Sequence, residues 1–223
     1  MKILIGTPIH ECKDYATERW LENVSKLQRQ TVADLFLVDN STSTDYVEKL
    51  KKYCAKYGIK NYKIEHFEVT NNDPSNARSQ KVEIAQEMIR REALKGEYDA
   101  WFSWECDQII PTNALNELIR IMKSENCMMV VHNSWSRTNP TDLNTNMGCT
   151  LIGREALQKG WFLPDKDGQI SFDLSDCYNV DETMFKKRVL KNGGNYIEAY
   201  GIISPIYHLN HVVEIGKASK EAL

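Results

Sequence analysis

The sequence lacks the features that mark membrane proteins, secreted proteins and zinc-binding proteins. None of its apolar runs approaches the roughly 20 residues that a membrane-spanning helix needs, and the apolar part of residues 1–8 is too short for a signal peptide. The six cysteines form no Cys-x-x-Cys pair, which favours reduced thiols over a disulfide framework or a zinc site. We therefore expect a cytoplasmic protein without a transmembrane segment.

An excess of positive charge and the common phosphate-binding loops are also missing. The net charge is −3 at pH 7, which gives no electrostatic reason to expect a nucleic acid or an anionic membrane as partner. The sequence contains neither Gly-x-x-x-x-Gly-Lys nor Gly-x-Gly-x-x-Gly, so P-loop and Rossmann dinucleotide sites lack their phosphate loop. A Gly-x-Ser-x-Gly motif, the signature of α/β-hydrolases, is absent too.

What the sequence does contain is a regular alternation of short apolar runs and amphipathic segments. The apolar runs predict strands at residues 2–6, 35–38, 62–69 and 127–131, with a helix between successive strands. This order predicts an α/β fold with a mostly parallel sheet and helices on both faces. The rhythm breaks after His132, so we expect one domain, 1–223, with a nucleotide-binding half at 1–131 and an irregular acceptor-side half at 132–223.

The stretch at residues 99–111 is the centre of this pattern. Large residues occupy both phases of its alternation, which predicts a strand that is covered on both faces. Two carboxylates, Glu105 and Asp107, come at its end, and the alternation predicts that they point to the same side. Carboxylates at the carboxyl end of a buried strand suit an oxygen-ligated cation that bridges to phosphates. Alternatively, Asp107 merely starts the turn and Glu105 is solvated.

Two further residues lie at the end of a predicted element, Asp39 at a strand end and Arg78 at a helix start. Asp39 ends the second predicted strand, where it can accept hydrogen bonds from a base or ribose, or simply cap the following turn. Arg78 lies in the first turn of a predicted helix, where the helix dipole already favours an anion such as a diphosphate. An exposed arginine on a helix is otherwise just solvated.

The late part of the chain offers an acidic pair and two histidines. Asp181 and Glu182 open a predicted helix, which is favourable on dipole grounds alone, but either carboxylate could also act as a general base. His208 and His211 follow a predicted extended segment and could donate an imidazole to a cation. With no cysteine or third histidine beside them, a zinc site is not expected.

In combination these segments resemble the GT-A class of nucleotide-sugar glycosyltransferases, in particular its family-2-like branch. Residues 3–8 are similar to the first strand of that family, and residues 36–41 to its second strand, whose Asp contacts the nucleobase. Residues 76–79 resemble its Ala-Arg-Asn helix start, with Ser in the last position. Residues 104–107 resemble its metal-binding Asp-x-Asp segment with Glu in the first position, and residues 181–188 its acidic pair and downstream Arg.

The resemblance implies a transfer of a sugar from a UDP- or GDP-sugar to a hydroxyl of a glycan, lipid or protein acceptor, with inversion. It implies a Mn²⁺ or Mg²⁺ ion held by Asp107 and by His208 or His211, with Glu105 contributing through water. It implies Glu182 or Asp181 as the general base. The residues that it implies beside the nucleotide are Thr7, Pro8, His10, Asp39, Arg78, Glu105 and Cys106.

Two other functions remain open from the sequence. A nucleotidyltransferase also joins an α/β sheet to a metal-bound triphosphate, but it needs a Gly-rich, basic loop after the first strand, and residues 6–11 do not supply one. A non-catalytic nucleotide-sugar-binding domain is the other alternative. Because Asp107 and the acidic pair are both present, we expect an enzyme.

Overall fold

The structure, a computed structural model, describes residues 1–69, 77–132, 134–135, 143–144, 147–163, 169–173 and 182–209. For residues 77–79, 134–135 and 143–144 it describes the backbone alone. None of the helices within these ranges is long and apolar enough to cross a membrane.

A seven-stranded sheet forms the centre of the molecule, with the order β10-β6-β9-β4-β1-β2-β3. Its first part is a parallel unit of four strands, β1 (Ile3–Ile9), β2 (Ala33–Asp39), β3 (Tyr62–His66) and β4 (Ala100–Trp104). The first part therefore has the parallel strand–helix alternation that the sequence predicts. The strand predicted at residues 62–69 is shorter in the structure and ends at His66.

The remaining strands of this sheet come from the second part of the chain. They are β6 (Met129–His132), β9 (Cys149–Gly153) and β10 (Tyr196–Ala199). β9 lies between β4 and β6 and runs antiparallel to both, whereas β10 runs parallel to β6. The sheet thus continues across residue 131, and the second part of the chain supplies one of its central strands.

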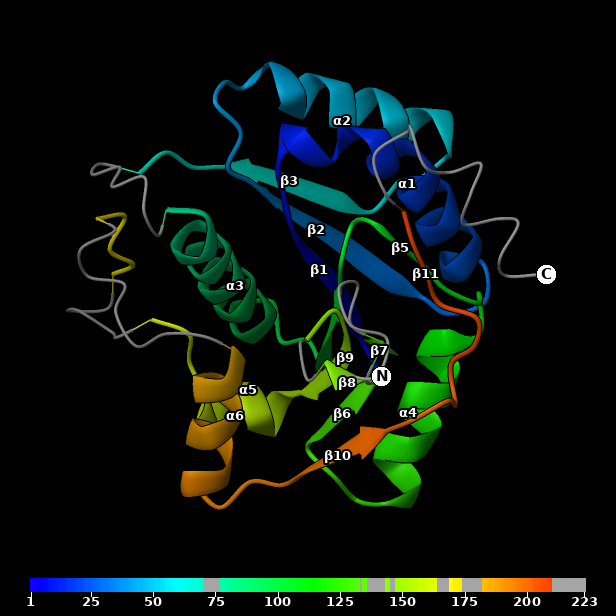
Figure 1. The fold of residues 1–223 in the computed structure, drawn as a ribbon, viewed down its shortest axis with the longest axis vertical. Coiled ribbons are helices and arrows are strands. Elements are labelled where there is room, and N and C mark those ends of the chain that lie inside the picture. Colours follow the sequence, from blue (N-terminus) through cyan, green and yellow to red (C-terminus); the bar gives the residue numbers. More distant parts are fainter. Residues whose placement is uncertain are drawn as a thin grey trace.

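Helices cover both faces of the sheet (Figure 1). One face packs against α1 (Asp14–Gln28), α2 (Asp45–Lys56) and α4 (Ala114–Ser124). The other face packs against α3 (Ala77–Lys95), α5 (Arg154–Lys159) and α6 (Glu182–Lys191). The mostly parallel α/β fold with helices on both faces is confirmed.

The spacing of apolar residues explains how each helix docks. In α1, Trp20, Leu21, Val24 and Leu27 recur every three or four residues and are fully buried, as expected for a helix with one apolar stripe. Strand β4 alternates between the two cores, with Phe102 in one and Trp101 in the other. Burial on both faces follows from large residues in both phases.

Short elements complete the fold around the ends of the strands. They are the 3₁₀ turn η1 (Glu11–Lys13), the paired strands β5 (Gln108–Ile109) and β11 (Tyr207–His208), and the paired strands β7 (Ser134–Trp135) and β8 (Leu143–Asn144).

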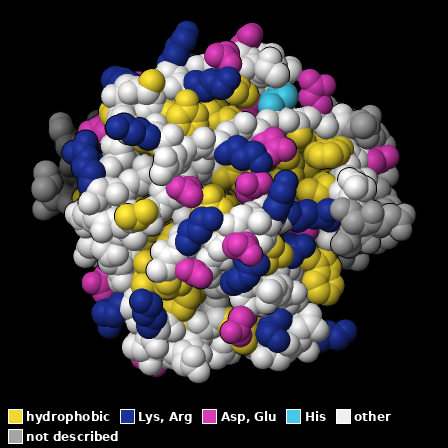
Figure 2. Space-filling model, turned by 180° about the vertical axis from the view of Figure 1, so that it is seen from behind, with side chains coloured by type: hydrophobic (Ala, Val, Ile, Leu, Met, Phe, Trp, Pro, Cys, Tyr) yellow, Lys and Arg dark blue, Asp and Glu magenta, His cyan; other side chains and the backbone are white. Residues whose placement is uncertain are grey.

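On the face shown in Figure 2, basic and acidic side chains are interspersed, with apolar side chains between them.

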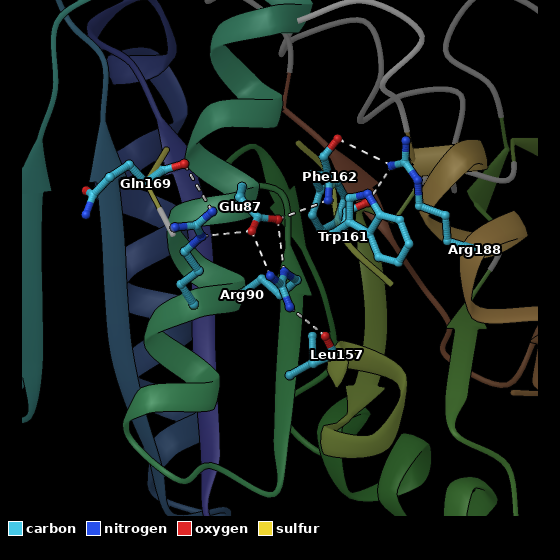
Figure 3. Close-up of polar contacts among 8 residues, drawn as sticks. Glu87, Arg90, Leu157, Trp161, Phe162, Gln169 and Arg188 are labelled. Atoms are coloured by element: carbon cyan, nitrogen blue, oxygen red, sulfur yellow. Dashed lines mark hydrogen bonds and ion pairs between the residues drawn. The ribbon is translucent and has the colours of Figure 1, made fainter. Parts of the chain in front are cut away.

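A buried ion cluster fastens α3 to the segment that follows α5 (Figure 3). The fully buried Glu87 carboxylate accepts hydrogen bonds from Arg90 Nε at 2.9 Å and from Arg91 Nε at 3.0 Å. It also accepts one from the backbone N–H of Phe162 at 3.0 Å. Arg90 in turn donates to the Leu157 carbonyl at 2.7 Å. The charge is therefore matched by donors from two parts of the chain.

Replacing Glu87 by Ala is expected to lower the free energy of unfolding by about 3 kcal/mol, because it removes the buried carboxylate that pairs with two partly buried guanidinium groups. Urea denaturation followed by tryptophan fluorescence measures the change. The matched control is Glu22→Ala, which removes an exposed pair with Lys26 in α1 and should leave the midpoint unchanged. Equal midpoints for the two variants would contradict a stabilising role for the cluster.

Candidate functional site

The carboxyl ends of β1, β2 and β4 meet at one edge of the sheet. At the end of β1, the buried Thr7 hydroxyl donates to the Trp104 carbonyl at 2.8 Å and so ties β1 to β4. Pro8 and His10 are partly exposed at the same end, and His10 Nδ1 accepts from the Cys12 backbone N–H at 3.0 Å, where η1 begins. Thr7 thus has a structural partner, whereas Pro8 and His10 are accessible at this edge.

The two carboxylates after β4 do not follow strand alternation. β4 ends at Trp104, and a turn closed by a 3.1 Å bond from Gln108 N–H to the Glu105 carbonyl follows it. The prediction that Glu105 and Asp107 point to the same side assumed that the strand continues through both residues. Because β4 ends at Trp104, that assumption is wrong. Glu105 Oε2 accepts from Gln108 Nε2 at 3.0 Å, whereas Asp107 contacts the start of α1.

Asp107 is a buried carboxylate with a cationic partner. Its side chain is 2% exposed, and its Oδ2 contacts the ammonium group of Lys13 from η1 and the Tyr15 hydroxyl, the latter at 3.3 Å. A buried charge of this kind requires a counter-charge and hydrogen-bond donors. Lys13 was not predicted as a site residue, because no motif marks it and the pairing depends on where η1 lies against the turn after β4.

The predicted metal ligands do not form a metal centre within the described residues. Asp107 Oδ2 contacts an ammonium group, and His208 Nε2 lies 2.9 Å from the Gln108 amide nitrogen and 3.5 Å from Glu105 Oε2. Across the described ranges, no three His, Cys, Asp or Glu side chains are arranged to hold an ion. His211 lies outside the described residues. The Mn²⁺ or Mg²⁺ ion therefore stays a prediction.

Asp39 is fully buried at the end of β2, and both of its oxygens have partners inside the protein. Oδ1 accepts from the Ser41 hydroxyl at 2.6 Å and from the Ser41 N–H at 3.2 Å. Oδ2 lies 2.7 Å from Nδ1 of His66, which ends β3 directly opposite Asp39. In this structure Asp39 orients His66. His66 was not predicted, because the strand expected at residues 62–69 placed it in the middle of a strand, whereas β3 ends at His66.

Glu182 begins α6 and lies against α3 and the chain before β9. Oε1 accepts from Gln86 Nε2 at 2.8 Å, and Oε2 accepts from the Met147 N–H at 2.7 Å. Burial raises the pKa of this carboxyl above its ordinary value, the two hydrogen bonds counter that rise, and the charge of Glu105 adds to it. A carboxyl with a raised pKa is suited to general base catalysis.

The other predicted site residues divide into two groups. Cys106 is 5% exposed and belongs to the same hydrophobic core as Tyr46 and Trp104, and burial raises the pKa of its thiol. Its side chain belongs to the core, and the position of Cys106 beside a nucleotide stays a prediction. Arg78 lies on the first turn of α3, where the structure describes the backbone alone. Asp181 lies outside the described residues.

Comparison with known proteins identifies similar folds but no similar sequences. No family model matches the chain, and no curated protein matches it in sequence. Staphylococcus aureus TarS 1–349 in complex with UDP-GlcNAc is similar over 90% of this chain and 58% of its own, with a TM-score of 0.59 and 12% identity. The complex of TarS 1–349 with UDP is similar over 90% and 60%, with a TM-score of 0.57 and 15% identity.

These neighbours are glycosyltransferases with the GT-A fold. At 12–15% identity the likeness shows the fold alone, and at that level the resemblance to the GT-A class is confirmed. The chain spans somewhat more than half the length of the TarS 1–349 chains that it matches.

Lys13→Met is expected to destabilise the protein by about 2 kcal/mol, because it removes the ammonium group that contacts the buried Asp107 carboxylate. The double variant Lys13→Met/Asp107→Asn removes both charges and should recover most of that loss. Urea denaturation of the two single variants and the double variant gives the coupling free energy. Additive effects would show that the two groups do not interact in solution.

Glu182 should make stability depend on pH. Because its pKa is higher in the folded state than the ordinary value of 4.5, the folded state binds a proton that the unfolded state releases. Its contribution is therefore present below about pH 4.5 and is lost as the pH rises through the folded pKa. The unfolding free energy of wild type minus that of Glu182→Gln should fall across this window. Parallel pH profiles for the two proteins would contradict the shift.

Proposed function

We propose that this protein is a glycosyltransferase that moves a sugar from a nucleotide-diphosphate sugar to an acceptor hydroxyl. The observation that carries the proposal is the fold, which matches TarS over 90% of this chain, including its complex with UDP-GlcNAc. The carboxylates Asp39 and Asp107 add support, because Asp39 ends β2 and Asp107 lies in the turn that follows β4, at the carboxyl ends of parallel strands. Open α/β sheets bind ligands at this edge.

Glu182 is the residue that we propose as general base. Two hydrogen bonds fix its carboxylate, and burial brings its pKa closer to neutrality. Such a base can take the proton of the acceptor hydroxyl as that oxygen attacks the anomeric carbon. The oxygen of the diphosphate leaves from the opposite face, so a single displacement inverts the anomeric centre. Asp181, the other candidate base, lies outside the described residues.

The donor that fits the proposal is a UDP- or GDP-sugar, and the acceptor is a hydroxyl of a glycan, lipid or protein. Lys13 brings a positive charge to the turn after β4, which favours an anionic diphosphate there. A Mn²⁺ or Mg²⁺ ion at Asp107 is part of the proposal on the grounds of the resemblance, and it would have to displace the Lys13 ammonium group from that carboxylate.

A binding module without turnover is the second candidate. The specific observation in its favour is that Lys13 and Tyr15 already contact the Asp107 carboxylate oxygen. A module of this kind would retain nucleotide binding and lose sugar transfer. Release of the nucleoside diphosphate in the presence of an acceptor separates the two functions, because only an enzyme releases it repeatedly.

Calorimetric titration with UDP, GDP and their sugars, in Mn²⁺ and in EDTA, tests the proposal. We expect one nucleotide to bind in Mn²⁺ with a dissociation constant at least tenfold lower than in EDTA. Asp107→Ala should abolish that difference, because it removes the proposed ligand.

The matched control is Asp99→Ala. It removes a carboxylate directly before the amino end of β4, where Asp99 accepts a hydrogen bond from the N–H of Lys2. This variant should bind like wild type. If the wild-type protein binds none of these nucleotides, with or without metal, the proposal is wrong. If a nucleotide binds equally well with and without metal and to Asp107→Ala, the proposed donor site stands and the proposed metal ion is wrong.

A further inference from the structure

A buried histidine fastens residues 200–209, which follow β10 and include β11 (Figure 1), to the end of β6. His132 is the last residue of β6 and is 2% exposed. Its Nε2 accepts a hydrogen bond from the backbone N–H of Ile203 at 3.1 Å. Ile203 is the single buried residue of the stretch 200–208, all of which is described. This bond, which spans 71 residues, is therefore one of few contacts that hold the segment.

The same bond establishes the protonation state of the ring. A backbone N–H can only donate, so Nε2 must carry a lone pair, and the imidazole is neutral with its proton on Nδ1. Nδ1 is buried and has no hydrogen-bond partner among the described residues. Burial also lowers the pKa of His132 below its ordinary value of 6.5. The geometry thus requires a neutral ring, and the surroundings favour one.

The elements around the ring bring no compensating charge to it within the described ranges. On β10, Ala199 lies opposite His132, and Glu198 alternates to the other face of the sheet. Burial is the cause of the lowered pKa of His132, without a contribution from a neighbouring charge. The titratable and charged groups on the neighbouring elements are Glu117, Arg120 and Lys123 of α4, Cys149 of β9, Glu198 of β10, and Tyr207 and His208 of β11.

Protonation would turn the contact between His132 and Ile203 into a repulsion. An imidazolium donates from both nitrogens, so its Nε2–H would face the backbone N–H of Ile203. The ring would also carry a buried charge without a partner, which is costly. A charged ring is therefore stable only when it has moved into water, and Ile203 then loses its acceptor. Because residues 200–208 bury so little, their local release costs less than unfolding of the sheet.

The segment also brings His208 to the turn after β4. β11 pairs with β5, and His208 Nε2 lies 2.9 Å from the amide nitrogen of Gln108. The N–H of Leu209 donates to the Asp107 carbonyl at 2.8 Å. The chain from 203 to 209 is thus attached to β6 at one end and to this turn at the other, so loss of the first attachment weakens the second.

We propose that His132 is an acid-sensitive switch, which holds residues 200–209 against the sheet while its ring is neutral and releases them when the ring is protonated. Release moves His208 away from Gln108 and opens the end of β6 to water. The switch does not depend on the proposed function, because it follows from a contact within the fold and its test involves no nucleotide.

The direction of the pH effect follows from the two states of the ring. The released ring has the ordinary pKa of 6.5, and the held ring has a lower pKa. The released state therefore binds a proton more readily, so its population rises as the pH falls below 6.5, by at most about tenfold per pH unit. The rise ends at the pKa of the held ring. Above pH 6.5 the held state is favoured and this term is constant.

Hydrogen exchange of the full chain, followed by mass spectrometry at about pH 7.5 and about pH 5, measures the release. After correction for the intrinsic rate at each pH, peptides that cover residues 203–209 should lose about tenfold in protection at the lower pH. Peptides from β1, in the middle of the sheet, should keep their protection, which distinguishes local release from unfolding of the whole chain.

His132→Gln keeps a side-chain carbonyl that can accept from the N–H of Ile203, but it cannot be protonated. Its peptides from residues 203–209 should be equally protected at both pH values. The matched control is His10→Gln, which replaces a histidine that also accepts from a backbone N–H but is partly exposed. This control should retain the pH dependence of wild type.

Nitrogen-15 NMR of wild type labelled in its histidines tests the switch without any variant. At about pH 7.5 His132 should show a protonated Nδ1 and an unprotonated Nε2, and its ring should titrate below the ordinary pKa of 6.5. A proton on Nε2, equal protection of residues 203–209 at both pH values in wild type, or a wild-type loss of protection in His132→Gln would show that the inference is wrong. The proposed function would stand in each of these cases.

Discussion

A buried carboxylate must be surrounded by donors or by opposite charge, and much of this structure depends on meeting that requirement. Glu87 is matched by two arginines and a backbone N–H, Asp39 by a histidine and a serine, and Asp107 by a lysine and a tyrosine. Glu182 takes an amide side chain and a backbone N–H. Each set of partners joins segments that are distant in the sequence, so the same contacts hold the fold together and position the groups at its edge.

The need to pair each buried carboxylate also explains why the accessible groups of the candidate site are not the residues that the motifs mark. The motif carboxylates Asp39 and Asp107 are almost completely inaccessible, and the protein uses their oxygens internally. The groups that they contact, His66 and Lys13, have side-chain exposures of 13% and 19% and are more accessible than the two carboxylates. Two of the residues that the resemblance implies, Asp39 and Asp107, thus hold neighbouring side chains in place, and those neighbours belong to no motif.

Sequence reasoning succeeds here where a property is local. The alternation of apolar runs predicts the parallel part of the sheet, and the end of β2 places Asp39 correctly, because strand ends and helix stripes depend on neighbouring residues. It fails where an unrecognised turn or a distant tertiary contact decides. The turn that starts after Trp104 separates the partners of Glu105 and Asp107, and the contact of Lys13 with Asp107 spans 94 residues. Nothing in the periodicity of a strand encodes its neighbours or its direction, so the position of β9 was not foreseen.

The position of β9 has a consequence for how the chain reaches this structure. β4 and β6 cannot pair directly, since β9 lies between them, and β9 follows both in the sequence. After residues 1–132 have emerged from the ribosome, β4 still has one open edge, and β6 has no partner in the sheet. The central sheet therefore closes only when residues 149–153 arrive, and its two parts become a single cooperative unit late in synthesis. Such non-local pairing slows folding and leaves an open strand edge exposed for longer.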